Sequence, residues 1–387
     1  EGDTLKEIYL DNSATTKVLE EVARAVFDTM TLHFGNPSSL HRKGIEAEKI
    51  MQEARENIAK ALGASPKEIY FTSGGTESNN WAVKGAAYAR RRKGNHLITT
   101  AIEHPSVLET FAALEREGFS VTYLQVDREG FIDLNQLKEA LTPETILVSI
   151  MYVNNEVGTI EPIQGAAQII KASSNALFHV DAVQAFAKIP LVSKLEGIDL
   201  LSLSGHKIYG PKGIGALFVR DKVSIAPLLH GGGQETGQRS GTENLPGIAG
   251  FGKAAKICID NLEKWHSQMV QLKERLMKGI LDNIPDTVLN GPVSGAPHIL
   301  NISFLGTRGE ILLHALESKN IYVSTGSACS SHKSGNSHVL KAMGKSEEEQ
   351  DGAIRFSLSP FLSMEDIDYT IEVLADEVRE IRKLMRR

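Results

Sequence analysis

Short apolar runs alternate with amphipathic stretches between residues 68 and 203. Apolar runs bounded by polar or Gly-rich turns are typical of buried strands, whereas apolar residues spaced three and four apart indicate helices. The predicted strands are 68–72, 96–100, 121–126, 146–151, 176–180 and 198–203, and the predicted helices are 79–89, 107–117, 134–141 and 162–173. Alternation at this spacing predicts an α/β fold with a doubly wound, mostly parallel sheet and helices on both faces.

The pattern differs at both ends of the chain. A short strand over 7–10 and a helix over 19–32 come first, followed by an amphipathic helix that reaches about Leu62. Ser39 is a candidate amino-terminal cap for this second helix, and Gly63 follows its carboxyl end. One long helix is predicted over 245–284 as the link to a second, α+β domain. That domain has predicted strands 299–304, 321–323 and 353–358, and predicted helices 310–318 and 364–384.

Composition narrows the class of protein without changing this picture. With 387 residues, 41% of them hydrophobic, the chain is long enough for two domains. A net charge of −6 gives no sign of direct nucleic-acid binding, and no apolar stretch is long enough to span a membrane. Two cysteines, Cys258 and Cys329, are too few for a disulfide framework, and the first residues lack a signal-peptide pattern. We therefore expect a cytoplasmic protein.

The stretch 176–215 carries the main candidate chemistry. Asp181 ends one predicted strand, with Gln184 three residues further on, and Lys207 follows the next strand in a Ser-Gly-His-Lys turn. An acid at the carboxyl end of a strand suits a buried cation, and a lysine in such a turn suits a carbonyl group. Pyridoxal phosphate offers both, a pyridinium nitrogen and an aldehyde. Either residue alone is more often a cap or a surface lysine, but the ordered pair favours this cofactor.

Other candidates also fall in turns after predicted strands. His104 and Asn155 follow two of the strands, so we expect them at the same sheet edge as Asp181 and Lys207. The turn 73–78, rich in small residues, opens a helix and could hold a phosphate, or it could simply cap that helix. A lone histidine after a strand is more often structural than catalytic. The shared edge is what favours function here.

Two loops complete the candidate chemistry. The Gly-rich loop 231–244 bears Arg239 and Thr242. The loop 324–338 is small and polar with Cys329 in its middle, an unusual place for a thiol unless it is reactive. Cys258, in contrast, lies in the apolar phase of a predicted helix and is expected to be inert packing. No zinc-type spacing of Cys and His is present, and no metal site is predicted with certainty.

These segments together resemble the cysteine desulfurases of the NifS/IscS class, which are fold-type I, class-V aminotransferase-like pyridoxal-phosphate enzymes. The resemblance covers essentially the whole chain, in the order LDNSATT, FGNPSSLH, FTSGGTES, IEHPSVL, NNEVGTI, HVDAVQAF, SGHKIYGPKGIGAL, GGGQETGQRSGTEN, STGSACSS and SHVLKAMG. It implies a large domain (16–260) with a seven-stranded type of sheet and a small domain (1–15 and 261–387) carrying the cysteine loop. It also implies a homodimer that converts L-cysteine to L-alanine.

The resemblance implies roles for the cofactor-binding residues. Lys207 would form the Schiff base and shuttle the Cα proton, Asp181 would pair with the pyridinium nitrogen, and Gln184 would donate to the phenolate oxygen. His104 would stack on the ring and assist proton transfer. The remaining implied cofactor contacts are Gly75, Thr76, Asn155, Ser204 and His206, with Thr242 reaching in from the partner subunit.

The resemblance also implies the sulfur chemistry. Asn155 and Arg355 would bind the substrate carboxylate, and Cys329 would attack the substrate sulfur to form a persulfide. The sulfur would pass to an iron–sulfur scaffold protein, a tRNA-thiolating enzyme or another acceptor, and Cys329 is a candidate ligand of a transferred iron–sulfur cluster. Three alternatives stay open: a selenocysteine lyase, another class-V aminotransferase-like enzyme, and a non-enzymatic scaffold with a vestigial site.

Overall fold

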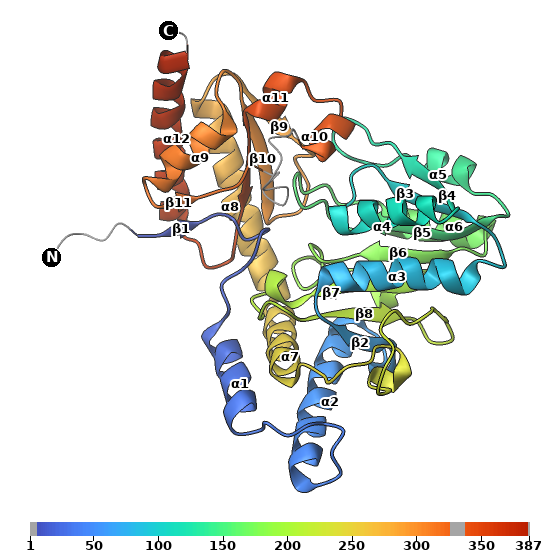
Figure 1. Ribbon diagram of the computed structural model, residues 1–387. Helices are drawn as coiled ribbons and strands as arrows, with labels where there is room; N and C mark the ends of the chain where they lie inside the picture. The colour runs from blue at the N-terminus through green and yellow to red at the C-terminus, as the bar shows by residue number, and fades with distance from the viewer. Residues whose placement is uncertain (1–5, 326–336, 386–387) are drawn as a thin grey trace.

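The centre of the molecule is a seven-stranded sheet (Figure 1). The structure is a computed structural model that describes residues 6–325 and 337–385. The strands, in the spatial order β2-β8-β7-β6-β5-β3-β4, are β2 (Ile69–Thr72), β8 (Gly215–Val219), β7 (Leu200–Ser204), β6 (Leu177–Asp181), β5 (Thr145–Met151), β3 (His96–Thr100) and β4 (Ser120–Leu124). The predicted α/β class and mostly parallel sheet are confirmed.

Strand β8 is the element of this sheet that the hydrophobic pattern did not reveal. It pairs antiparallel with β7 on one side and with β2 on the other. Two reversals in succession return β2 to the direction of the remaining strands. The carboxyl ends of β2, β3, β5, β6 and β7 therefore meet at one edge of the sheet.

Helices cover both faces of the sheet because successive side chains of each strand point to opposite faces. On β6, Phe178 packs into the apolar layer beneath α2 and α7, whereas Leu177 packs into the layer beneath α3 and α4. Both layers are built from buried aliphatic and aromatic side chains. The helices of this part are α1 (Glu20–Thr31), α2 (Arg42–Leu62), α3 (Gly75–Arg90), α4 (Pro105–Arg116), α5 (Leu134–Ala140), α6 (Ile163–Ser173) and α7 (Leu245–Asp260).

The amino-terminal strand β1 lies beside the carboxyl-terminal part of the chain (Figure 1). A second apolar core joins these two segments. It contains Leu10 from the amino-terminal segment together with Phe304, Phe356 and Leu374. Its sheets are antiparallel β12-β10-β9 and parallel β1-β11, made of β1 (Ile8–Tyr9), β9 (Thr287–Asn290), β10 (Ile299–Phe304), β11 (Ile321–Tyr322) and β12 (Ala353–Ser357). Its helices are α8 (Leu262–Asn283), α9 (Gly309–Glu317), α10 (His338–Ala342), α11 (Glu347–Asp351) and α12 (Met364–Met385).

The prediction of a single helix over 245–284 is wrong, because the helix is interrupted at Asn261. This residue has φ −109° and ψ 5°, and its backbone N–H donates to Ile257 O, which closes α7. Its side-chain Nδ2 donates to the same carbonyl at 2.9 Å. The two helices pack into different cores: α7 buries residues in the large core, and α8 buries residues in the second core. The spacing of apolar residues in the sequence does not reveal the break between them.

The predicted cap of α2 is also wrong. The helix begins at Arg42, and the side chain of His41, not of Ser39, accepts a hydrogen bond from Gly44 N at 3.3 Å. The carboxyl end follows the prediction, because Gly63 takes the left-handed conformation with φ 64°. Among the described residues there are also four short 3₁₀ helices, at Pro66–Glu68, Ser193–Leu195, Gly205–Lys207 and Glu235–Gly237. Within the described ranges, none of the helices combines the length and apolarity needed to cross a bilayer.

Candidate active site

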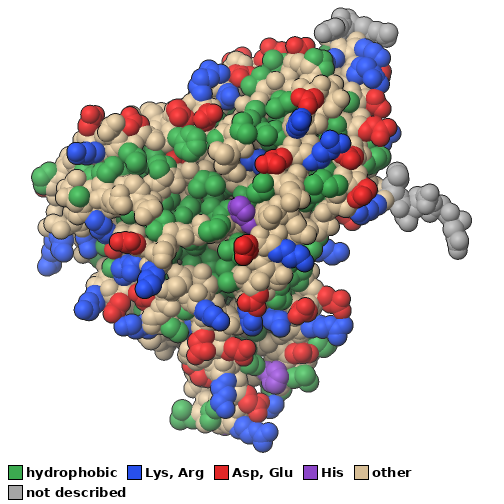
Figure 2. Space-filling view, turned by 180° about the vertical axis from the view of Figure 1, so that it is seen from behind, with side chains coloured by type: hydrophobic (Ala, Val, Ile, Leu, Met, Phe, Trp, Pro, Cys, Tyr) green, Lys and Arg blue, Asp and Glu red, His purple; other side chains and the backbone are tan. Residues whose placement is uncertain are grey.

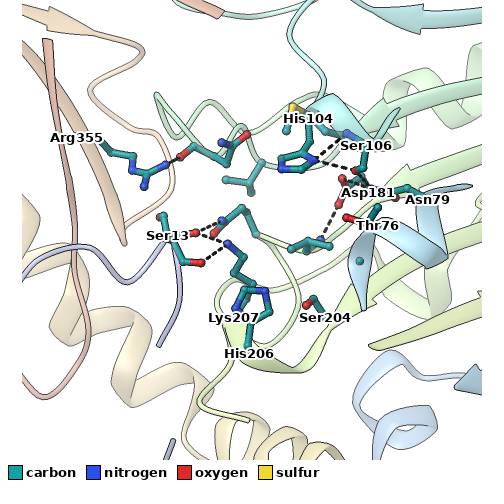
Figure 3. Close-up of a pocket in the computed structure, with 17 residues that line it drawn as sticks. Ser13, Thr76, Asn79, His104, Ser106, Asp181, Ser204, His206, Lys207 and Arg355 are labelled. Atoms are coloured by element: carbon teal, nitrogen blue, oxygen red, sulfur yellow. Dashed lines mark hydrogen bonds between the residues drawn. The ribbon is translucent and has the colours of Figure 1, made fainter. Parts of the chain in front are cut away.

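A cavity of about 290 Å³ opens at the edge where the parallel strands end (Figure 3). The expectation that His104, Asn155, Asp181 and Lys207 share this edge is confirmed, since all four line the cavity. The other predicted site residues that line it are Gly75, Thr76, Gln184, Ser204, His206 and Arg355. Thr242 is not brought to this cavity within one chain, and Cys329 lies outside the described residues.

Asp181 sits at the carboxyl end of β6 with its carboxylate buried. Its Oδ1 accepts a hydrogen bond from Val183 N at 3.0 Å, and its Oδ2 accepts from Asn79 Nδ2 at 2.9 Å. Two neutral donors orient the carboxylate without neutralising it. A carboxylate held in this way at a cavity wall suits a cationic group bound in the cavity.

His104 caps α4 and is joined to Asp181 by two polar side chains (Figure 3). Asn79 Nδ2 donates to Asp181 and also to Ser106 Oγ, each at 2.9 Å. Ser106 Oγ lies 2.8 Å from His104 Nδ1, and Ser106 N donates to the same nitrogen at 3.1 Å. Because a backbone N–H can only donate, Nδ1 of His104 must be the unprotonated nitrogen.

The ring of His104 is therefore neutral with its proton on Nε2. Burial lowers the pKa of His104, and the nearby Lys207 lowers it further, while Asp181 opposes them. In this tautomer the ring edge away from Ser106 carries a hydrogen-bond donor rather than a base.

We predict this tautomer as a spectroscopic result. Long-range ¹H–¹⁵N correlation on histidine-labelled protein should show a His104 ring with Nε2 protonated and Nδ1 unprotonated at neutral pH. The chain has 12 histidines, so loss of one signal set in His104→Asn provides the assignment. A His104 signal with its proton on Nδ1 would contradict the geometry around Ser106.

Lys207 ends the 3₁₀ helix that follows β7 and projects into the cavity. Its Nζ donates to Ser13 O at 2.5 Å and to Ala14 O at 2.8 Å. The segment around Ser13 is held in turn by Ser357, whose Oγ accepts from Ser13 N at 2.8 Å. The amine is thus positioned by backbone carbonyls from a segment near the amino terminus, 194 and 193 residues earlier in the chain.

The amino terminus of α3 forms the wall of the cavity next to Ser204. Gly74 precedes the helix with φ 153°, and a Cβ on Gly75 would come within 2.9 Å of Val183 Cγ2. Ser204 Oγ is buried and has no hydrogen-bond partner among the described residues. Burial, with a contribution from Lys207, lowers the pKa of the neighbouring His206 to about 4, so its imidazole is neutral. Free backbone donors at a helix amino terminus beside an unpaired hydroxyl suit a phosphate group.

Arg355 closes the other end of the cavity and is 3% exposed. Its Nη2 forms an ion pair with Asp11 Oδ1 at 2.9 Å, and its Nη1 donates to Asn155 O at 3.0 Å. Nε is buried without a partner among the described residues. The guanidinium is fixed in place and retains donor capacity toward the cavity.

The Gly-rich loop carries Thr242 away from the cavity of its own chain. Thr242 is exposed and lines a separate hollow with Arg239. Two bidentate ion pairs hold the loop: Arg55 with Glu235 at 2.6 and 2.9 Å, and Arg239 with Glu77 at 2.7 and 3.1 Å. The loop is therefore held in one place although much of its surface is exposed.

Sequence reasoning missed several residues of the site. Asp11, Ser13 and Ala14 lie in the polar turn after β1, and Asn79 and Ser106 lie in the first turns of α3 and α4. One available signal was the adjacency of Ser106 to His104, because a Ser two residues after a capping His is within reach of its ring. Over residues 6–325 and 337–385, no group of three His, Cys, Asp or Glu side chains could hold a metal ion.

Comparison with known proteins decides the family. The class-V aminotransferase family model matches residues 8–370. The chain belongs to the class-V aminotransferase family.

Relatives within the family are similar over almost their whole length. A protein named cysteine desulfurase IscS from Clostridium botulinum is 47% identical over 98% of this chain and 96% of its own length. Another of that name from Methanosarcina thermophila is 48% identical over 98% of this chain and 94% of its own. The solved structure of a NifS-like protein superposes with a TM-score of 0.91, at 41% identity, covering 97% of this chain and all of the other.

Proposed function

We propose that this protein is a pyridoxal-phosphate-dependent cysteine desulfurase, which converts L-cysteine to L-alanine and transfers the sulfur to an enzyme cysteine. The observation that carries the proposal is one cavity bounded by the Lys207 amine, the Asp181 carboxylate and the Arg355 guanidinium. It stands in a chain whose relatives with that name match it over nearly its full length. These three groups are what an amino-acid substrate and a pyridine cofactor require.

The residues present fit pyridoxal phosphate. The phosphate would lie against the amino terminus of α3 at Gly75 and Thr76, where Ser204 Oγ and His206 also face the cavity. Asp181 would meet the pyridinium nitrogen, Gln184 and Asn155 the ring substituents, and His104 the ring face. When bound, the cofactor supplies an aldehyde for amines and a ring that withdraws electrons from the substrate Cα.

Three side chains of the protein would carry out the remaining steps of the reaction. Lys207 would hold the cofactor and move the proton at the substrate Cα, and its contacts with Ser13 O and Ala14 O keep its amine at the cavity wall. Asp181 would keep a proton on the ring nitrogen. Cys329 would attack the substrate sulfur as a thiolate and carry it to an acceptor, such as an iron–sulfur scaffold protein.

Arg355 would bind the substrate carboxylate with Asn155 beside it. We predict that Arg355→Ala lowers kcat/KM for cysteine by roughly 30-fold to several-thousand-fold, equivalent to about 2–5 kcal/mol. The reason is that the substitution removes the desolvated pair between the guanidinium and the substrate carboxylate. Cofactor content should stay normal, since Arg355 lies at the opposite end of the cavity from Ser204. Arg275→Ala is a matched control, because Arg275 forms an exposed pair with Asp368 at 2.7 Å. Unchanged kinetics in Arg355→Ala would remove this residue from the site.

We also propose a homodimer in which Thr242 reaches the phosphate of the partner's site. The fixed, outward-facing loop supports this arrangement. Large apolar side chains on α1, α2 and their connection are exposed, Leu40 by 95%, and are suited to an interface; they are Phe27, Met30, Leu32, Phe34, Leu40 and Ile45. Hydrophobic side chains also gather across the middle of the face in Figure 2, apart from the lower end of the molecule where α1 and α2 lie (Figure 1).

We also propose that the chain is divided into a large domain (16–260) and a small domain (1–15 and 261–387). This division is supported by the second apolar core, which joins Ile8 and Leu10 to residues beyond 270.

The test of the proposed function is cysteine turnover by purified, cofactor-loaded protein. Alanine should form in equal amount to sulfide in the presence of a reductant, without any keto acid. Alanine formation that requires a keto acid would indicate an aminotransferase, and strong preference for selenocysteine would indicate a selenocysteine lyase. Absence of both products from a protein that binds the cofactor would reject the proposal.

A further inference from the structure

A buried lysine lies directly behind the cavity. Lys188 belongs to the turn segment after β6 and is 6% exposed. Its Nζ donates to Gln184 Oε1 at 3.3 Å, the one hydrogen bond that this amine makes to a described residue. Gln184 lines the cavity, whereas Lys188 does not.

This lysine is costly for the fold. Burial lowers the pKa of Lys188 to about 7, and the charges of Lys207 and Arg355 act in the same direction. Its partner is a neutral amide rather than a carboxylate, so no ion pair with a described residue neutralises its charge. A methionine would fill a similar volume without this cost, which indicates that the amine has a role other than packing.

The role follows from the contacts of the Gln184 amide. Its Nε2 donates to Ser13 O at 3.0 Å, and its Oε1 accepts from Lys188. In the flipped orientation, Oε1 would face the Ser13 carbonyl oxygen and the amide hydrogens would face the amine of Lys188. Both contacts exclude the flipped orientation, because one would place two acceptor oxygens together and the other would place two hydrogen-bond donors together.

We propose that Lys188 is a positioning residue that holds the Gln184 amide with its N–H donors toward the cavity. An amide nitrogen carries two hydrogens, and Ser13 O takes one of them. The other is thereby directed at an acceptor bound in the cavity, the phenolate oxygen of the cofactor. This inference rests on the proposed function, because it assigns the acceptor to pyridoxal phosphate.

The test compares Lys188→Met with a matched buried lysine. Lys273 is 5% exposed and donates to Ala296 O at 2.9 Å, burial lowers its pKa to about 8, and it does not line the cavity. In holoenzyme, Lys188→Met should weaken cofactor binding by at least about tenfold, the lower end of the contribution of a hydrogen bond to a charged group. It should also raise the pH at which the visible absorption band of the bound cofactor titrates, while Lys273→Met changes neither. Equal behaviour of the two variants would overturn the proposal.

A double-mutant cycle separates positioning from a general effect of burial. If Lys188 acts through Gln184, adding Lys188→Met to Gln184→Met should cause no further loss of cofactor affinity. Additive losses would overturn the proposal. If Lys188→Met does not fold, Lys188→Gln replaces it, since it keeps a neutral donor and should retain affinity that the Gln184→Met variant loses. These readouts need no cysteine turnover, so they stand apart from the test of the proposed function, which fails if the unsubstituted protein turns over no cysteine.

Discussion

Lys207→Ala is expected to give a folded protein that cannot attach pyridoxal phosphate covalently. Borohydride reduction should leave no cofactor on the chain, and the visible absorption of the bound cofactor should disappear. The reason is positional, because Lys207 Nζ lies at the cavity wall between the phosphate side and Arg355, held by Ser13 O and Ala14 O. Peptide mass spectrometry after reduction of the unsubstituted protein should find the modification on Lys207.

The neighbouring lysines provide the controls for this prediction. Lys212 is exposed and does not line the cavity, so Lys212→Ala should bind cofactor normally. Lys188 is buried, with its amine hydrogen-bonded to Gln184. Modification of either lysine in the unsubstituted protein would disprove the assignment of Lys207.

Cys329→Ser is expected to abolish sulfur transfer, lowering turnover by at least about a thousandfold, while cofactor binding is retained. The chain has two cysteines, and Cys258 is excluded by its surroundings. It is 1% exposed, and its Sγ donates to Ile208 O at 3.4 Å. Burial raises the pKa of Cys258 to about 12, so on the order of 10⁻⁵ of this thiol is ionised at pH 7.

Cys258→Ala is the matched control and should turn over cysteine at a rate close to that of the unsubstituted protein. Mass spectrometry after a cysteine pulse under non-reducing conditions should find one extra sulfur on the peptide that contains Cys329. An extra sulfur on Cys258 instead, or unchanged transfer in Cys329→Ser, would reject this role.

The central sheet could be predicted well from the sequence because β3, β5, β6 and β7 are buried along their whole length and form apolar runs in the sequence. Strand β3 occupies the predicted residues 96–100, and β6 and β7 differ from the prediction by one or two residues at their ends. β8 was missed because it follows a Gly- and Pro-rich turn and opens on Gly215. The interruption at Asn261 was missed because the helical spacing of apolar residues continues from α7 into α8, so the sequence shows no end of a helix there.

Asp181 and Lys207 were predictable as a pair, because an acid after one strand and a lysine after the next match the ring nitrogen and the aldehyde of a single cofactor. The carbonyls of Ser13 and Ala14 were not, because any residue supplies a carbonyl and only the tertiary fold brings residues 13 and 207 together. Asn79 and Ser106 were hidden for a related reason, since both lie where a helix start alone would explain them.

The reversed strand β8 limits which residue can stand at its first position. Gly215 pairs with Thr72 at the end of β2 and with Ser204 at the end of β7. It therefore lies at the sheet edge between the turn that leads into α3 and the end of β7, the two segments proposed to hold the phosphate. A Cβ at this position would meet Gly74 Cα at 2.7 Å and Leu203 O at 2.6 Å. The turn after β2 therefore crosses directly over Gly215 to bring Gly75 near Ser204. A single methyl group at residue 215 would wedge these two segments apart, although Gly215 itself does not line the cavity.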